Sequence, residues 1–248
     1  ANSPLITSST SPDRIHTYVS TGTYTITISG FMPGFSVNNN AAIRTLITEL
    51  VQWGIVGVRT INFYGCQNLT TIPGSASLSG VGGYTGLNEV QSFANFMRGT
   101  RITSIPSDIF NFSPSATTFT DTFSTITTLT NVPSGLFNNV PTATTFASCF
   151  FGCTALTSVP STLFDTNINV VNFSGTFRNC RSLTNVLQFT NNTNVTIFNN
   201  VYNMSSTANS LTGTAPELWN RTPTPSGTDA FNNCTGLANF ASIPLNWK

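Results

Sequence analysis

Hydrophobic positions along most of this chain follow one pattern that recurs at regular intervals. A Phe or Tyr is followed, usually six residues later, by Leu or Ile, and a Val-Pro or Ile-Pro pair usually comes next. Between Phe96 and Phe177 the aromatic position recurs every 27 residues. The ring positions are Phe63, Phe96, Phe123, Phe150, Phe177, Tyr202 and Phe231. A fixed period of about 20–50 residues is typical of a solenoid, in which each repeat packs against the next.

One repeat predicts the elements of a single turn. Phe146, Phe150 and Cys153 are spaced i, i+4 and i+7, which predicts one face of a short helix. A Leu-x-x-Val sequence follows and predicts a short strand, which Pro160 ends because proline has no backbone N–H. No turn can bury its apolar edge alone, so we predict an α/β solenoid of about seven stacked turns with short parallel strands and short helices.

The pattern divides the chain into three parts. These are a Ser/Thr/Pro-rich linker at 1–13, a hairpin and capping helix at 14–57, and the repeats at 58–248, which end in a capping turn. Tyr and Ile alternate with Thr over 17–29, which predicts the β-hairpin. Apolar residues at helical spacing from Ile43 to Val51 predict an amphipathic helix that Gly54 ends. Because a solenoid needs its open end covered, we expect the hairpin and helix to cap it.

Composition narrows the class of protein. Charged residues make up 7% of the chain, against about 25% in an average soluble protein, and the formal net charge is +1. A neutral surface rich in Ser, Thr and Asn gives no basic face for nucleic acid. No apolar run approaches the roughly 18 residues of a membrane span, so we expect no membrane insertion. The composition favours an extracellular, cell-surface or virion location.

Two strings carry a resemblance to a known family. Residues 63–69 and 231–237 both read Phe-x-x-Cys-x-x-Leu, the signature of BspA-like leucine-rich repeats. The LT-x-V-P-x-x-LF string at 156–164 resembles the longer-period branch found in bacterial surface proteins and phage particles. The resemblance covers roughly 58–247. Upstream, the segment 16–27 resembles the closing hairpin of a PKD-like β-domain.

The resemblance carries expectations about fold and function. It implies a leucine-rich-repeat-like horseshoe or ladder on an extracellular or virion surface. Members of the family are usually adhesins, fibre tips or receptor-binding proteins, and they are not known as enzymes. A chain of this kind is expected to belong to a larger fibre or particle, with a homotrimer as one candidate arrangement.

Most of the five cysteines fall into the repeat register. Four of them follow a ring position by three residues, namely Cys66, Cys153, Cys180 and Cys234. A position set by the repeat favours a small apolar core residue over half of a disulfide. Cys149 lies outside this register and is a candidate free thiol.

Two pairs of arginines are candidate ligand-binding residues. Arg98 and Arg101 follow one ring, and Arg178 and Arg181 follow another. Together they would form a basic stripe that binds acidic glycans or carboxylates. The alternative is that they are isolated, solvated arginines, because two repeats separate the pairs.

A column of threonines and one tryptophan are the other candidates. Thr103, Thr130, Thr157 and Thr184 each follow the repeat Leu or Ile. In a stack they form either a regular polar surface for a glycan or ice, or a row of hydroxyl-to-backbone hydrogen bonds at the bend. Trp219, which is less regular than the Phe positions, is either a ligand contact or part of the terminal cap.

No grouping of residues predicts catalysis or a cofactor. His16 is the single histidine, there is no Gly-x-Ser-x-Gly sequence, and the eight acidic residues form no close pair. We therefore expect a non-enzymatic recognition module of adhesin or fibre-tip type, without metal or cofactor. Its partner would be a host or cell-surface glycan or protein. The alternative is a purely structural virion component, such as a decoration or fibre protein.

Overall fold

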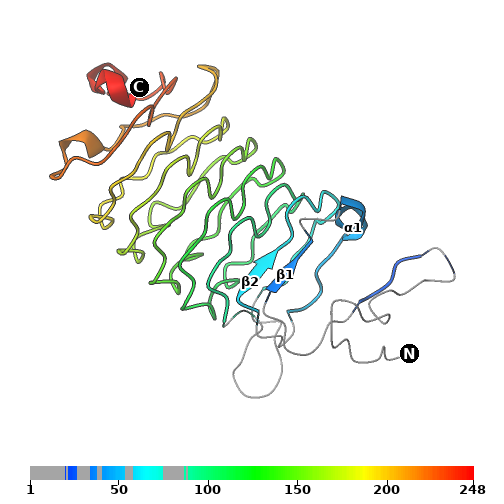
Figure 1. Cartoon of the computed structure of the whole chain (residues 1–248). Coiled ribbons are helices and arrows are strands. Elements are labelled where there is room, and N and C mark those ends of the chain that lie inside the picture. Colours follow the sequence, from blue (N-terminus) through cyan, green and yellow to red (C-terminus); the bar gives the residue numbers. More distant parts are fainter. Residues whose placement is uncertain are drawn as a thin grey trace.

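The computed structural model describes residues 20, 22–26, 34–37, 41–53, 58–74, 87 and 89–248. The predicted linker at 1–13 and most of the predicted hairpin at 17–29 lie outside these residues. The helices and strands are short: β1 (Gly34–Ser36), α1 (Ala41–Leu46), β2 (Thr60–Asn62), and the 3₁₀ helices η3 (Leu218–Asn220), η4 (Phe240–Ser242) and η5 (Leu245–Trp247). Figure 1 shows that the remaining chain nevertheless winds as regular coils lying side by side along one axis.

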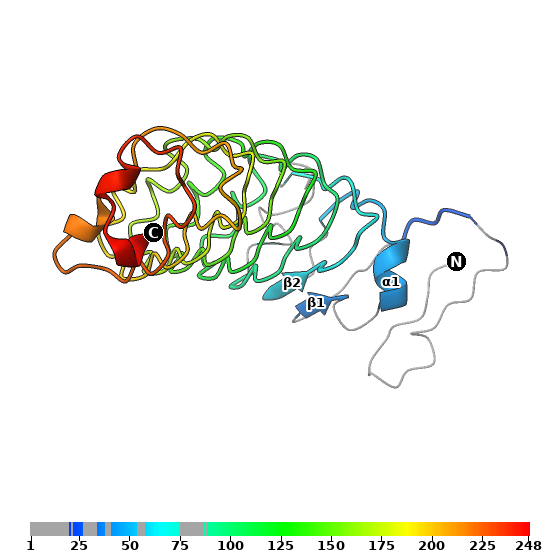
Figure 2. The same cartoon turned by 90° about the horizontal axis from the view of Figure 1, so that it is seen from above.

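Parallel pairing joins each coil to the next. One bridging residue comes from each of seven successive turns: Thr60, Ser92, Thr118, Thr145, Asn172, Ile197 and Ser226. At the N-terminal side β1 pairs in parallel with β2, with Phe35 opposite Ile61. Figure 2, the view from above, shows β1 and α1 at one end of the stack and the C-terminal 3₁₀ helices at the other. A second series of parallel bridges includes Asn131 with Ser158, within the predicted strand position.

The densest pairing between turns runs through the segment around each aromatic ring. Every second residue from Phe146 to Gly152 donates its N–H to a carbonyl 26 residues later, over 2.8–3.0 Å. The residues between them, from Cys149 to Cys153, donate to the carbonyl three residues back and close successive β-turns. Peptide groups therefore alternate between bonds across the stack and bonds within the turn. We call this arrangement the alternating ladder.

The alternating ladder differs from the helix predicted for Phe146, Phe150 and Cys153. Ser148 and Gly152 have φ of 54° and 69°, in the left-handed region. Such a residue every four positions interrupts a helix and brings each fourth side chain back to the same face. Spacings of i and i+4 are thus met by consecutive β-turns, which leave half of the N–H groups available to the neighbouring turn.

The core contains three columns of stacked aromatic rings, which pack among buried aliphatic side chains and cysteines. The first, with centroids 5.3–5.9 Å apart and planes within 16°, contains Phe123, Phe150, Phe177, Tyr202 and Phe231. The second, with centroids 5.1–5.9 Å apart, contains Phe93, Phe119, Phe146, Phe173 and Phe198. The third contains Phe110, Phe137, Phe164 and Phe189. Edge contacts such as that of Phe137 with Phe146, at 4.6 Å, join the columns.

One ring position of the sequence pattern is displaced. Phe63 donates its N–H to Phe96, and Met97 donates its N–H to Thr122. These bonds place Met97, rather than Phe96, at the position that Phe63 and Phe123 occupy in their turns. Phe96 is buried beside them and packs edge-on against Phe93 at 5.1 Å.

The N-terminal helix is shorter than predicted. α1 ends at Leu46, which is exposed, and none of its residues is buried. Beyond it, Leu50 donates its N–H to Thr71 and Thr70 donates its N–H to Thr48, each over 3.1 Å. The second half of the predicted helix is therefore extended chain, because its backbone groups pair with the next turn.

All five cysteines are buried free thiols. Cys153 and Cys180 hydrogen-bond through Sγ to the carbonyls of Phe123 and Phe150 in the preceding turn, at 3.1 and 3.0 Å. Cys149, outside the repeat register, is buried as well. Burial raises the pKa of the Cys153 thiol from its ordinary value of 9.0 to about 12, so these groups stay protonated and inert at neutral pH.

Truncating one ring of the first column is expected to destabilise the fold strongly. Phe150 lies 5.7 Å from both Phe123 and Phe177, between the two rings. Phe150→Ala should lower the free energy of unfolding by about 3–5 kcal/mol, because it leaves a cavity in a close-packed column. Phe112, 42% exposed, is the control, and Phe112→Ala should cost less than about 0.5 kcal/mol in the same chemical denaturation experiment. Similar losses for the two variants would contradict this account.

Stability is expected to fall at alkaline pH because of the buried thiols. Burial raises the pKa of Cys234 from 9.0 to about 12, so the folded state keeps a proton that the unfolded chain releases. The unfolding free energy should therefore be constant below pH 9 and decrease as the pH rises from 9 toward 12. In Cys234→Ser, whose hydroxyl can still donate to the Tyr202 carbonyl, the decrease should be smaller. The unfolding free energy of both proteins would be measured by urea denaturation at each pH. An equal decrease with pH in the two proteins would contradict this account.

Candidate ligand-binding groove

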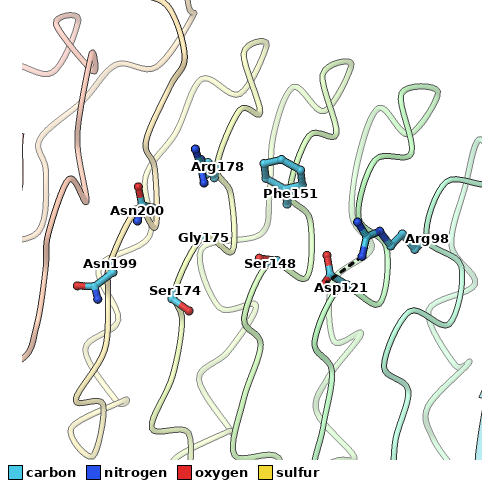
Figure 3. Close-up of a pocket in the computed structure, with 9 residues that line it drawn as sticks. All are labelled: Arg98, Asp121, Ser148, Phe151, Ser174, Gly175, Arg178, Asn199 and Asn200. Atoms are coloured by element: carbon cyan, nitrogen blue, oxygen red, sulfur yellow. Dashed lines mark ion pairs between the residues drawn. The ribbon is translucent and has the colours of Figure 1, made fainter.

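A shallow polar groove of about 380 Å³ crosses the outer face of several turns. Figure 3 shows its lining side chains on successive turns, with Arg98 near one end and Asn199 and Asn200 at the other. The lining residues are Arg98, Asp121, Ser148, Phe151, Ser174, Gly175, Arg178, Asn199 and Asn200. The groove therefore combines two guanidinium groups, one carboxylate, one ring and several hydroxyl or amide groups.

The floor of the groove follows from the alternating ladder. Asp121, Ser148, Gly175 and Asn200 are equivalent positive-φ residues of four successive turns, with φ between 54° and 63°. Short side chains and glycine suit this conformation best, and the row consists of one Asp, one Ser, one Gly and one Asn. At Gly175 no side chain is present, and a Cβ there would lie 3.2 Å from the Ser148 hydroxyl. The hollow is deepened where glycine replaces a side chain.

The wall of the groove is one register position repeated along the stack. Inter-turn hydrogen bonds place Tyr64, Arg98, Ser124, Phe151 and Arg178 at the same position in successive turns. An arginine lies over the ring of the turn before it in two places, Arg98 over Tyr64 at 5.1 Å and Arg178 over Phe151 at 5.8 Å. Between these two pairs stands Ser124, which is small and buried. The wall is thus two cation–aromatic pairs separated by a gap.

The two arginines of the groove are in different electrostatic states. Arg98 lies 3.5 Å from Asp121 and donates to the Asn95 side chain at 3.1 Å. Arg178 is exposed, and no carboxylate of the described residues pairs with it. Because Asp121 offsets the charge of Arg98, the unbalanced positive charge of the groove lies at the Arg178 end.

The structure brings together half of the predicted arginine stripe. Arg98 and Arg178 line the same groove, although two turns lie between the turn of Arg98 and the turn of Arg178. Arg101 and Arg181 are exposed outside the lining, and Arg181 donates to the Ser205 hydroxyl. Sequence reasoning missed Phe151, because a Phe directly after a ring position reads as core.

Two of the four threonine hydroxyls in the predicted column bond to the backbone. Thr157 donates through Oγ1 to the Thr130 carbonyl, and Thr184 donates to the Thr157 carbonyl, each at 3.0 Å. This is the hydroxyl-to-backbone alternative of the two considered for this column. Thr103 is exposed on the same series of turns. None of these residues lines the groove.

Trp219 lies at the C-terminal end of the stack, in η3. Its ring is edge-on to Phe231 at 6.3 Å and to Trp247 at 6.0 Å, and it is partly buried. Trp247, in η5, accepts the N–H of Phe231 at its carbonyl over 2.7 Å. Trp219 therefore packs within the terminal cap and is not among the residues that line the groove.

The described part of the chain offers no metal site. Among the residues that the structure describes, no three His, Cys, Asp or Glu side chains form a group able to hold an ion. In the same residues, no helix has the length and apolar character needed to cross a bilayer. His16, the one histidine of the sequence, lies outside the described residues.

Comparisons with known proteins add no relative. No protein-family model matches the chain, and no curated protein matches it. The resemblance to BspA-like repeats therefore stays a prediction that depends on the repeated motifs.

Replacing a threonine of the column is expected to affect stability rather than binding. Thr157→Val removes one hydroxyl bond to Thr130 without changing the side-chain shape, so it should lower the unfolding free energy by about 1 kcal/mol. Thr154→Val is the matched control, because Thr154 is exposed and lies nearby in the same turn. Chemical denaturation and binding to intact cells would be measured on both variants. Loss of cell binding at unchanged stability in Thr157→Val would instead support the polar-surface alternative.

Proposed function

We propose that this chain is a non-enzymatic recognition module of adhesin or fibre-tip type that binds a cell-surface ligand, with a glycan favoured. In this proposal the stack is a leucine-rich-repeat-like solenoid carried by a larger fibre or particle, on an extracellular, cell or virion surface. The groove between Arg98 and Asn200 is its binding site.

The observation that carries the proposal is the groove itself. The aromatic rings, thiols and column threonines are engaged in packing or in bonds between turns. The groove instead presents side chains that are not buried in the core, including the exposed Arg178 guanidinium and the half-buried Phe151 ring. A ring face with nearby hydroxyl, amide and charged groups is the combination that suits a polar, ring-shaped ligand such as a sugar.

The chemistry of the lining supports binding rather than catalysis. Its one carboxylate, Asp121, is engaged by Arg98, and the serine hydroxyls at 148 and 174 have no histidine or second carboxylate beside them in the lining. Acid–base hydrolysis of a glycosidic bond needs a pair of carboxyl groups, and an activated serine needs a base. Neither pair is present among the groove residues.

Filling the groove is expected to abolish recognition. Gly175→Asn adds a side chain that tolerates φ of 63°, as Asn200 does one turn on, so the backbone should be preserved. Labelled chain should bind candidate host cells or a glycan array, and Gly175→Asn should bind at least about tenfold more weakly. Phe112→Ala, on an exposed ring outside the groove lining, serves as the control with unchanged binding.

Two results would contradict the proposal. One is that the unaltered chain binds no cell surface and no glycan, which would favour the structural virion alternative. The other is that Gly175→Asn binds as well as the unaltered chain while its unfolding midpoint is unchanged, which would place recognition elsewhere.

A further inference from the structure

Resting on the proposed function, we propose that the groove binds an acidic sugar unit whose carboxylate or sulfate group is held by Arg178. The ligand class is then an acidic glycan, and its neighbouring units would run along the axis of the stack toward Arg98 and Tyr64.

Arg178 has the surroundings of an anion-binding residue. Its guanidinium lies over the Phe151 ring at 5.8 Å, and it has no hydrogen-bond partner among the described residues. A guanidinium that lies over a ring without other partners keeps its N–H groups available to a ligand. Two of these N–H groups match two oxygens of a carboxylate or sulfate, so both acids are bound by the same chemistry.

The charge distribution favours an anion at this end of the groove. Asp121 is the carboxylate of the lining, and Arg98 holds it at 3.5 Å. At the Arg98 end the charges of Arg98 and Asp121 nearly cancel each other, whereas no lining residue balances the charge of Arg178. An acidic group that enters the groove is therefore attracted most strongly by the charge of Arg178, and at that end it is repelled least by the carboxylate of Asp121.

Neutral parts of a sugar would meet hydroxyl and amide groups. The side-chain oxygen of Asn199 accepts bonds from the Ser226 hydroxyl at 2.7 Å and from the Thr228 N–H at 2.9 Å. Its NH₂ group is thereby oriented and left as a donor for a ligand. Ser148 and Ser174 add hydroxyls on the two neighbouring turns, and the missing side chain at Gly175 gives the ring of the sugar its space.

The repetition of the wall favours a chain of sugars over a single one. Three steps between turns separate Arg178 from Arg98, or about 15 Å at the roughly 4.8 Å spacing of paired backbones. Arg98 again lies over a ring, that of Tyr64, at 5.1 Å, and Arg44 lies over the same ring at 5.6 Å. An acidic oligosaccharide that spans this distance would meet a second cation–aromatic pair, so affinity should rise with chain length.

The test uses galacturonic acid oligomers, neutral galactose oligomers of equal length and a sulfated galactan, titrated into the full chain by calorimetry. We expect at least one acidic polymer to bind, with the neutral oligomers at least about tenfold weaker and acidic binding weakened by salt. Binding of one acidic polymer alone identifies the acid group. Longer acidic oligomers should bind more tightly than the monomer.

Three variants separate a specific site from general charge. Arg178→Gln should lose at least about tenfold in affinity. Arg181→Gln removes the same charge three residues away, outside the groove lining, and should bind normally. Asp121→Asn should bind acidic oligomers more tightly, because it releases Arg98. Asparagine is compatible with the positive φ there, as at Asn95.

The result that overturns the inference is binding of neither acidic polymer, or equal losses in Arg178→Gln and Arg181→Gln. If such a result occurs while cells are still bound and Gly175→Asn still abolishes that binding, the acidic ligand is wrong and the recognition function stands. Unfolding midpoints of all variants would be measured to confirm that each is folded.

Discussion

The alternating ladder of backbone hydrogen bonds is the constraint on which the rest of this molecule depends. Because every second N–H from Phe146 to Gly152 bonds to the next turn, neighbouring turns are held in one register. That register places aromatic rings directly over one another, about 5–6 Å apart, and so builds the three columns of the core. The ladder also includes left-handed residues such as Ser148, a conformation that favours short side chains on the outer surface there.

The groove is a consequence of this repetition rather than an insertion into it. Each turn presents one residue at the same outer position, and the occupants of that position alone distinguish one stretch of surface from another. Where the occupants are Arg98, Ser124, Phe151 and Arg178, a small buried serine stands between large side chains on the neighbouring turns. In a chain with 7% charged residues, two guanidinium groups in one groove are an unusual concentration of charge.

The sequence pattern predicted the buried positions better than their local conformation. The period placed Phe123, Phe150 and Phe177 and the cysteines three residues beyond each ring, and all of these side chains are buried. It did not distinguish a helix from consecutive β-turns, because both return to one face after four residues. It also misaligned the turn of Phe96, since only the inter-turn bonds show that Met97 takes the column position. Arg98 and Arg178 were recognisable as candidates, but their separation in sequence hid their common groove and the ion pair with Asp121.

Within the alternating ladder, the hydrogen bonds between turns all donate in one direction. Its N–H groups point toward the C-terminal end and its carbonyls toward the N-terminal end, whereas Thr144 and Val171 donate to the preceding turn, at Thr117 and Thr144. At the C-terminal end the donors of Asp229 and Phe231 are met by the carbonyls of Asn246 and Trp247. The short helix η5 thus does for these two ladder donors what a capping residue does for a helix, because its carbonyls accept their N–H groups.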